Sequence, residues 1–90
     1  MKGFYVDLVR GKKVAFLAGP FPDEPTARKY ERAAVAKANE VDPWSHFDPY
    51  GVVAIDLAKV PQLKQLPPGK LNDMIGIDPA DLIEHQPELI

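Results

Sequence analysis

The chain has 90 residues, the size of a single domain, and it contains no cysteine. Charged residues make up 27% and the net charge is −2, so the composition excludes both a strongly basic nucleic-acid binder and an acidic disordered tail. No apolar run is long enough for a membrane span and no secretory leader is evident, so we expect a cytoplasmic protein that does not contact a membrane.

Two strands joined as a hairpin are predicted at the start of the chain. Apolar residues alternate with other residues in 3–10 and again in 14–19, which is typical of half-buried strands. In the expected register, the inward residues of the two strands oppose each other: Phe4, Val6 and Leu8 against Ala18, Phe16 and Val14. This register leaves Arg10, Gly11 and Lys12 as the loop, and it avoids placing Asp7 opposite Phe16 on the core face. The prolines at 20 and 22 predict the end of the second strand.

A helix and a third strand complete the predicted core. Asp23 is a good N-cap, Pro25 is tolerated in a first turn, and Asp42 with Pro43 ends the helix. The helix carries one apolar stripe: Ala27, Tyr30, Ala34, Ala38 and Val41. Residues 51–57 read as a third strand. The predicted fold class is therefore α+β, a ββαβ core over residues 1–57 with a small antiparallel three-stranded sheet and one main helix. We expect these residues to hold the fold together: Phe4, Val6, Leu8, Phe16, Tyr30, Ala34, Val53 and Ile55.

Residues 58–90 are predicted to be an irregular, proline-rich C-terminal extension of the same single domain. Asp78 and Pro79 favour the start of a short helix within it. The extension has many apolar residues that need burial, so it either completes the core or docks on a second copy or another partner. Residues 1–41 hold eight basic and five acidic side chains, whereas residues 42–90 hold three and eight. This division suggests that the acidic extension covers the basic helix face, or competes with an anionic ligand for it.

Three segments resemble a group of small proteins of unknown function encoded by phages and prophages. The first is a Gly-Pro-Phe turn within residues 17–24, followed by an alanine-rich helix. The second is the Asp-Pro, His-Phe and aromatic-Gly pattern of residues 42–51, and the third is the Leu-Asn motif within residues 69–77. The resemblance implies a viral or mobile-element origin, with the cytoplasm of the host as the location, and no activity.

No residue pattern favours catalysis or a cofactor. Ser45 is the only serine, and its neighbour His46 does not by itself give the geometry of a triad. Asp42, His46 and Asp48, with His85, offer oxygen and nitrogen ligands but not a diagnostic metal spacing. Turn and packing roles explain these residues better. We therefore expect a protein that is not an enzyme and that binds neither a cofactor nor a metal.

The sequence favours a small accessory or protein-interaction module that binds a protein partner or itself. The alternative is a nucleic-acid-binding domain, because basic and aromatic side chains occur together. The aromatic residues 44, 47 and 50 are more easily explained as core anchors near the helix end. The candidate binding surface comprises Lys12, Lys13, Arg28, Lys29, Arg32, Trp44, His46 and Tyr50.

Overall fold

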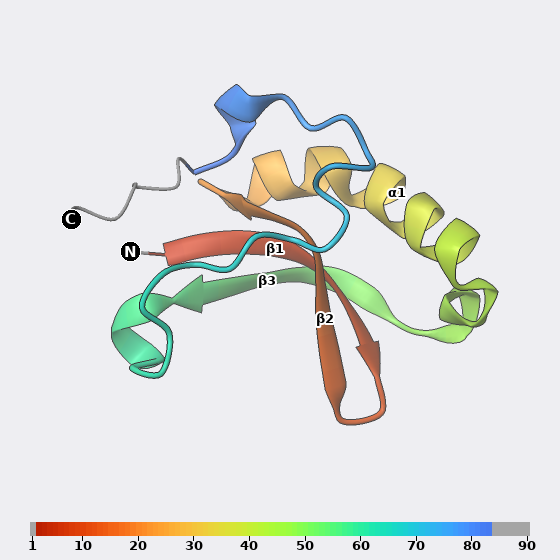
Figure 1. Ribbon diagram of the computed structural model, residues 1–90, viewed down its shortest axis with the longest axis horizontal. Coiled ribbons are helices and arrows are strands. Elements are labelled where there is room, and N and C mark those ends of the chain that lie inside the picture. The colour runs from red at the N-terminus through yellow and green to blue at the C-terminus, as the bar shows by residue number, and fades with distance from the viewer. Residues whose placement is uncertain (1, 84–90) are drawn as a thin grey trace.

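The computed structural model describes residues 2–83 and contains one antiparallel sheet and one main helix. Its elements are β1 (Lys2–Arg10), β2 (Lys13–Phe21), α1 (Glu24–Val41), η1 (Pro43–Phe47), β3 (Tyr50–Asp56), η2 (Leu57–Lys59) and η3 (Pro79–Asp81), where η marks a short 3₁₀ helix. The strand order is β2-β1-β3, and α1 lies across one face of the sheet (Figure 1). The predicted α+β class and the ββαβ order are confirmed.

The helix begins and ends where the sequence predicts. The Asp23 carboxylate accepts hydrogen bonds from the Thr26 backbone N–H at 2.9 Å and from the Thr26 hydroxyl at 2.6 Å. Four stripe residues are buried against the sheet: Ala27, Tyr30, Ala34 and Ala38. The prediction for Val41 is wrong. Val41 is 62% exposed, because the last turn of α1 borders an open groove instead of the sheet.

The predicted hairpin register is wrong. The loop has two residues, Gly11 and Lys12, because Arg10 pairs with Lys13. Gly11 has a φ of 59°, the left-handed conformation that two-residue hairpin loops require. Asp7 consequently lies opposite Phe16, the pairing that the sequence disfavoured.

Irregularities in the pairing of β1 with β2 explain this register. Leu8 opposes Ala15 and Val6 opposes Ala18, so Leu17 is an extra residue on β2. Beyond this bulge, Ala18 again faces α1 opposite Val6. The bulge also brings Leu17 into the core, where it is 5% exposed. Phe16 instead lies on the face away from α1.

Cover on that second face is uneven, because Tyr5 is 0% exposed whereas residues toward the hairpin loop are open. The Phe16 ring packs against Tyr5 with ring centroids 4.8 Å apart, while Val14 is 51% exposed. Burial raises the pKa of Asp7, but this face lacks the cover of the helix and the carboxylate is tolerated there. Val53 and Ile55, which the sequence placed in the core, are half-buried on this face.

The second strand continues past its predicted end. It runs through Pro20 to Phe21, whose ring stacks on Tyr30 at a centroid distance of 5.2 Å. Proline is compatible with an edge strand at a bulge, and the β1–β2 pairing is irregular at this point. The extra length gives the core its largest stacked pair of rings.

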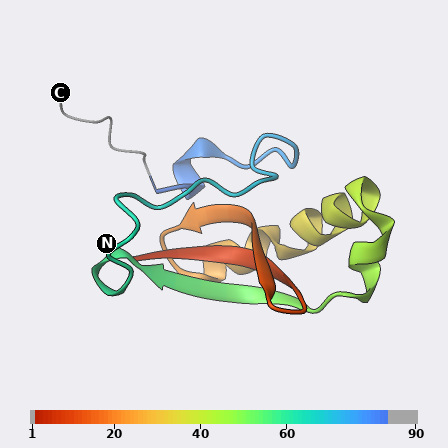
Figure 2. The same cartoon turned by 60° about the horizontal axis from the view of Figure 1, so that its bottom comes forward.

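The C-terminal extension lies along the outer edge of β2 (Figure 2). The backbone N–H groups of Gly69, Lys70 and Leu71 donate to carbonyls of Gly19, Phe16 and Leu17, at 3.0, 2.8 and 2.8 Å. The Asn72 side-chain amide makes two hydrogen bonds with Gly19: its oxygen accepts from the Gly19 N–H, and its nitrogen donates to the Gly19 carbonyl oxygen. This edge of the sheet is therefore covered by the chain itself.

Apolar and polar contacts both fix the extension. Leu66 and Leu71 are 3% and 8% exposed, so they belong to the core. The Tyr5 hydroxyl donates to the Pro67 carbonyl at 2.6 Å, and burial raises the pKa of Tyr5 to about 12. The described part of the extension thus packs on the sheet and the helix.

An ionic contact ties η3 to the helix. The Tyr30 hydroxyl donates to the Asp81 carboxylate and accepts from the Asp78 N–H at 3.1 Å. Lys29 forms an ion pair with Asp81 at 3.1 Å. An acidic residue of the extension therefore pairs with one cation of the basic helix face, whose side chain stays 63% exposed.

The Asp81 contact is expected to make stability depend on acid pH. Hydrogen bonds from Tyr30 and then from Lys29 lower the pKa of Asp81. A carboxyl with a lowered pKa stabilises the fold above its unfolded pKa of about 3.9, and this contribution disappears as the pH falls through the folded value. We expect Asp81→Asn to lower the thermal midpoint at about pH 7 and to leave it unchanged near about pH 2. Circular dichroism measures both midpoints.

Two comparisons isolate this effect from other titrations. Asp23, whose pKa is lowered by the Thr26 hydrogen bonds against a smaller opposing effect of the Asp81 charge, titrates in both the wild type and the Asp81→Asn variant, so its own contribution is present in both curves. Asp73→Asn changes an exposed acid of the same extension and should not move the midpoint. A difference between wild type and Asp81→Asn that is equal at both pH values would contradict the assignment.

Candidate functional site

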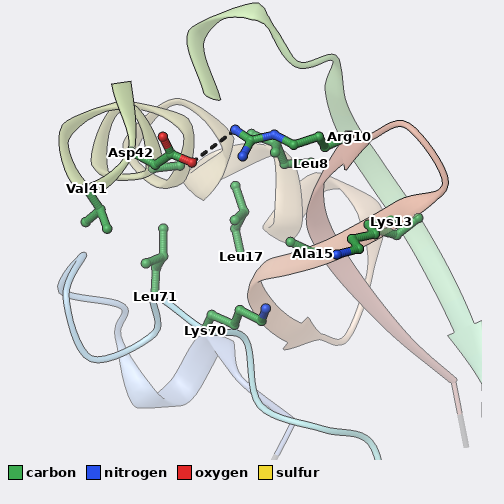
Figure 3. A pocket seen from close by; sticks show the side chains of 11 residues that line it. Leu8, Arg10, Lys13, Ala15, Leu17, Val41, Asp42, Lys70 and Leu71 are labelled. Carbon is green, nitrogen blue, oxygen red and sulfur yellow. Dashed lines mark ion pairs between the residues drawn. The ribbon is translucent and has the colours of Figure 1, made fainter. Parts of the chain in front are cut away.

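A groove of about 620 Å³ opens between the hairpin, the end of α1 and the C-terminal extension (Figure 3). Its volume is in the range of about 300–1,000 Å³ that is typical of ligand pockets. The floor is aliphatic and consists of Leu8, Ala15, Leu17, Ala38, Val41 and Leu71. An aliphatic floor of this kind favours the apolar part of a ligand.

Three basic residues border this groove: Arg10, Lys13 and Lys70. Among residues 2–83, no carboxylate forms an ion pair with Lys13 or Lys70. Figure 3 shows the two lysine amines directed toward the space between β2 and the extension. The groove therefore combines an apolar floor with two positive charges that a ligand can meet.

Arg10 differs from the two lysines because it is held by acids. Its guanidinium contacts the Asp42 carboxylate at 3.0 Å and the Asp48 carboxylate at 2.7 Å. Hydrogen bonds to Asp48 and then to Asp42 raise the pKa of Arg10. These ion pairs tie the end of β1 to both ends of η1, so Arg10 shapes the groove wall instead of offering a free charge.

The backbone of the extension positions one side of the groove. Lys70 and Leu71 take their places because their N–H groups donate to Phe16 and Leu17 of β2. Lys13 is placed from the other side by the two-residue hairpin loop. The groove therefore exists only while the extension is docked.

The predicted helix cations are partly neutralised. Arg28 forms an ion pair with Glu31 at 2.8 Å, and Lys29 is paired with Asp81. Arg32 borders a separate hollow of about 310 Å³ beside Tyr50. Lys12 is exposed in the hairpin loop. Of the eight predicted surface residues, only Lys13 lines the groove, and the others are spread over the hairpin loop, α1, η1 and the start of β3.

The aromatic residues after the helix are exposed, so their predicted role as core anchors is wrong. Trp44, Phe47 and Tyr50 are 72%, 75% and 55% exposed. The turn η1 directs Ser45 inward, where it is 4% exposed, and the rings outward. The Phe47 ring contacts Trp44 and His46, with centroids 6.2 and 5.6 Å away.

The residues considered for catalysis and metal binding have other partners. The Ser45 hydroxyl donates to the Asn39 side chain at 2.6 Å. Asp42 and Asp48 both bind Arg10. Across residues 2–83 no three acidic, histidine or cysteine side chains cluster as metal ligands would, and His85 lies outside the described residues.

The sequence did not identify Arg10, Lys70 or the leucines of the groove floor as site residues. The signal for Lys70 was present, since it is the last basic residue of the chain and stands directly before Leu71. Its meaning depends on the contact between residues 69–71 and β2, which is a long-range pairing. Sequence periodicity carries no information on such a pairing.

Comparisons of the chain with protein-family models, with curated proteins and with solved structures found no match. Within the described part of the chain, α1 is too polar to serve as a transmembrane helix and the other helices are too short.

Proposed function

We propose that this chain is a small, non-enzymatic protein-interaction module whose groove binds an acidic and apolar segment of a partner protein. One observation carries the proposal: the aliphatic floor is bordered by Lys13 and Lys70, for which residues 2–83 provide no acid partner. A phage or prophage origin, suggested by the resemblance of three segments, belongs to this proposal.

Charge and shape both support an acidic peptide as the ligand. The groove is open to solvent and not an enclosed cavity, so it suits side chains of a segment that passes over it. Leucine, isoleucine or phenylalanine would bury against Leu17 and Leu71, while aspartate or glutamate would meet the two lysines. The pairing of Arg28 with Glu31 and of Lys29 with Asp81 partly neutralises two cations of the competing nucleic-acid surface.

Selection from a random 12-residue peptide display library tests this proposal. Selected peptides are expected to be rich in acidic and large aliphatic residues. The variant Lys13→Glu/Lys70→Glu should bind them at least about tenfold more weakly by isothermal titration calorimetry. The matched control, Lys59→Glu/Lys64→Glu, changes the net charge equally at two exposed lysines outside the groove and should bind normally.

Two results would overturn the proposal. One is equal binding by the two double variants, which would place the peptide elsewhere. The other is the absence of acidic enrichment together with saturable, salt-sensitive binding of single-stranded nucleic acid. The emission of Trp44, the only tryptophan, reports that binding directly because the ring is exposed.

A further inference from the structure

The two edges of the sheet differ in how they are covered. Residues 69–71 donate hydrogen bonds to the edge strand β2. At the opposite edge, no backbone hydrogen bond from elsewhere in residues 2–83 reaches the outer side of β3. β3 pairs with β1 in an unbroken register over seven residues, and its sequence lacks lysine, proline and any bulge. Lysine, proline and bulges are the features that proteins normally use to protect an open edge, so β3 is unprotected by them.

The phase of the β1–β3 ladder identifies the outward backbone groups. Val9 donates to Pro49 at 2.9 Å and continues the register of the ladder. Hydrogen-bonded pairs alternate in an antiparallel ladder, so Gly51, Val53 and Ile55 bond to β1. The N–H and C=O groups of the alternate residues therefore point outward: Tyr50, Val52, Ala54 and Asp56.

We infer that β3 pairs with β3 of a second copy across a two-fold axis at Val53, which makes one continuous six-stranded sheet. This axis places Val52 opposite Ala54 and Tyr50 opposite Asp56, so outward groups meet outward groups along the whole strand. An axis between two residues would oppose outward groups to inward ones and could not form these bonds. The strand is thus self-complementary in its backbone.

Side chains favour the same arrangement. The two Val53 side chains meet at the axis on the face away from α1, and β-branched pairs stabilise such contacts. In this pairing Asp56, the only charged residue of β3, lies opposite Tyr50 of the second copy. Tyr50 and Arg32 line the same hollow of about 310 Å³ beside this edge, so a cation faces the incoming carboxylate. The two Asp56 residues stand at opposite ends of the paired strands, about 20 Å apart, and do not repel each other.

Sedimentation of the full chain from about 10 μM to about 1 mM tests this pairing. We expect the mass to rise from 10.0 kDa toward twice that value as the concentration increases. Ala54→Lys places a charge at the edge and should raise the dissociation constant at least about tenfold. The matched control is Ala33→Lys, on the exposed surface of α1, which should dimerise normally.

Ala54→Pro provides a second variant, because it removes an outward N–H and leaves the bonds between β1 and β3 intact. Circular dichroism verifies that each variant is folded. A monomer at every concentration, a dimer that survives both Ala54 variants, or equal weakening by Ala33→Lys would each overturn the inference. Peptide binding by the groove does not enter this test, since Ala54 does not line the groove. Failure of one proposal therefore leaves the other intact.

Discussion

Gly69→Ala is expected to lower the free energy of unfolding by about 3 kcal/mol, because the added methyl group would collide with backbone. A Cβ at this position would lie 2.5 Å from the Ala18 Cα and 2.7 Å from its carbonyl carbon and nitrogen. Backbone atoms within β2 cannot move aside, so the extension must lift from the strand. The hydrogen bonds of residues 69–71 to β2 would be lost with it. Urea denaturation followed by circular dichroism measures the change.

Gly51→Ala is the matched control for this substitution. A Cβ at Gly51 would find its nearest neighbour, the Asp7 carboxylate, at an ordinary contact distance of 3.7 Å. Its effect should stay within about 0.5 kcal/mol. If Gly69→Ala were as stable as Gly51→Ala, the close approach of the extension to β2 would be refuted.

Leu66→Ala is expected to cost about 3 kcal/mol, the second large effect. Leu66 is 3% exposed, and its side chain fills the space above Gly3, where no Cβ intervenes. Truncation of a buried leucine removes apolar contact and leaves a cavity, which together cost about 2–5 kcal/mol. For a domain with a total stability of about 5–15 kcal/mol, this loss is visible as a clear shift of the urea midpoint.

Met74→Ala is the matched control for Leu66→Ala, because it truncates an exposed residue of the same extension. Met74 is 57% exposed, so its truncation should change the stability by less than about 1 kcal/mol. Equal, small costs for Leu66→Ala and Met74→Ala would mean that the extension does not contribute to the core.

The helix could be predicted from the sequence because its signals are local. The Asp23 cap, the proline after Asp42 and the buried stripe each depend on residues within a few positions of one another. Asp78 likewise caps η3 by accepting from the Ala80 N–H, as its position before Pro79 predicts. Only Val41, at the helix end, departs from the pattern.

The hairpin register could not be predicted because the alternation of inward and outward side chains is interrupted along β2. A bulge at Leu17 changes which residues face α1, and the apolar run of residues 14–18 fits either phase. Leu17 and Phe16 are both apolar, so the sequence did not distinguish the residue for the core from the one for the second face. Tyr5 makes the difference, because its ring packs on Phe16.

The site was largely missed because one side of it comes from a segment without regular structure. Lys70 and Leu71 reach the groove through hydrogen bonds between the extension and β2. The exposed rings of Trp44 and Phe47 were expected in the core for a related reason. Aromatic residues are usually buried, and only the direction of η1 turns these outward.

Docking of the extension is expected to link stability to the proposed peptide binding. The same three residues that cover the β2 edge bring a lysine and a leucine to the groove. Gly69→Ala should therefore weaken peptide binding as well as stability, whereas Leu66→Ala lowers stability from a position outside the groove. Binding measured on the folded fraction separates these two effects.

Amide chemical-shift mapping with a selected acidic peptide shows where on this chain the peptide binds. We expect the amides of Leu17, Ala38, Lys70 and Leu71 to shift together with one dissociation constant, since they surround one groove. Shifts centred on Trp44 and Phe47 would contradict it, because that binding would use the exposed rings and not the lysine-bordered groove.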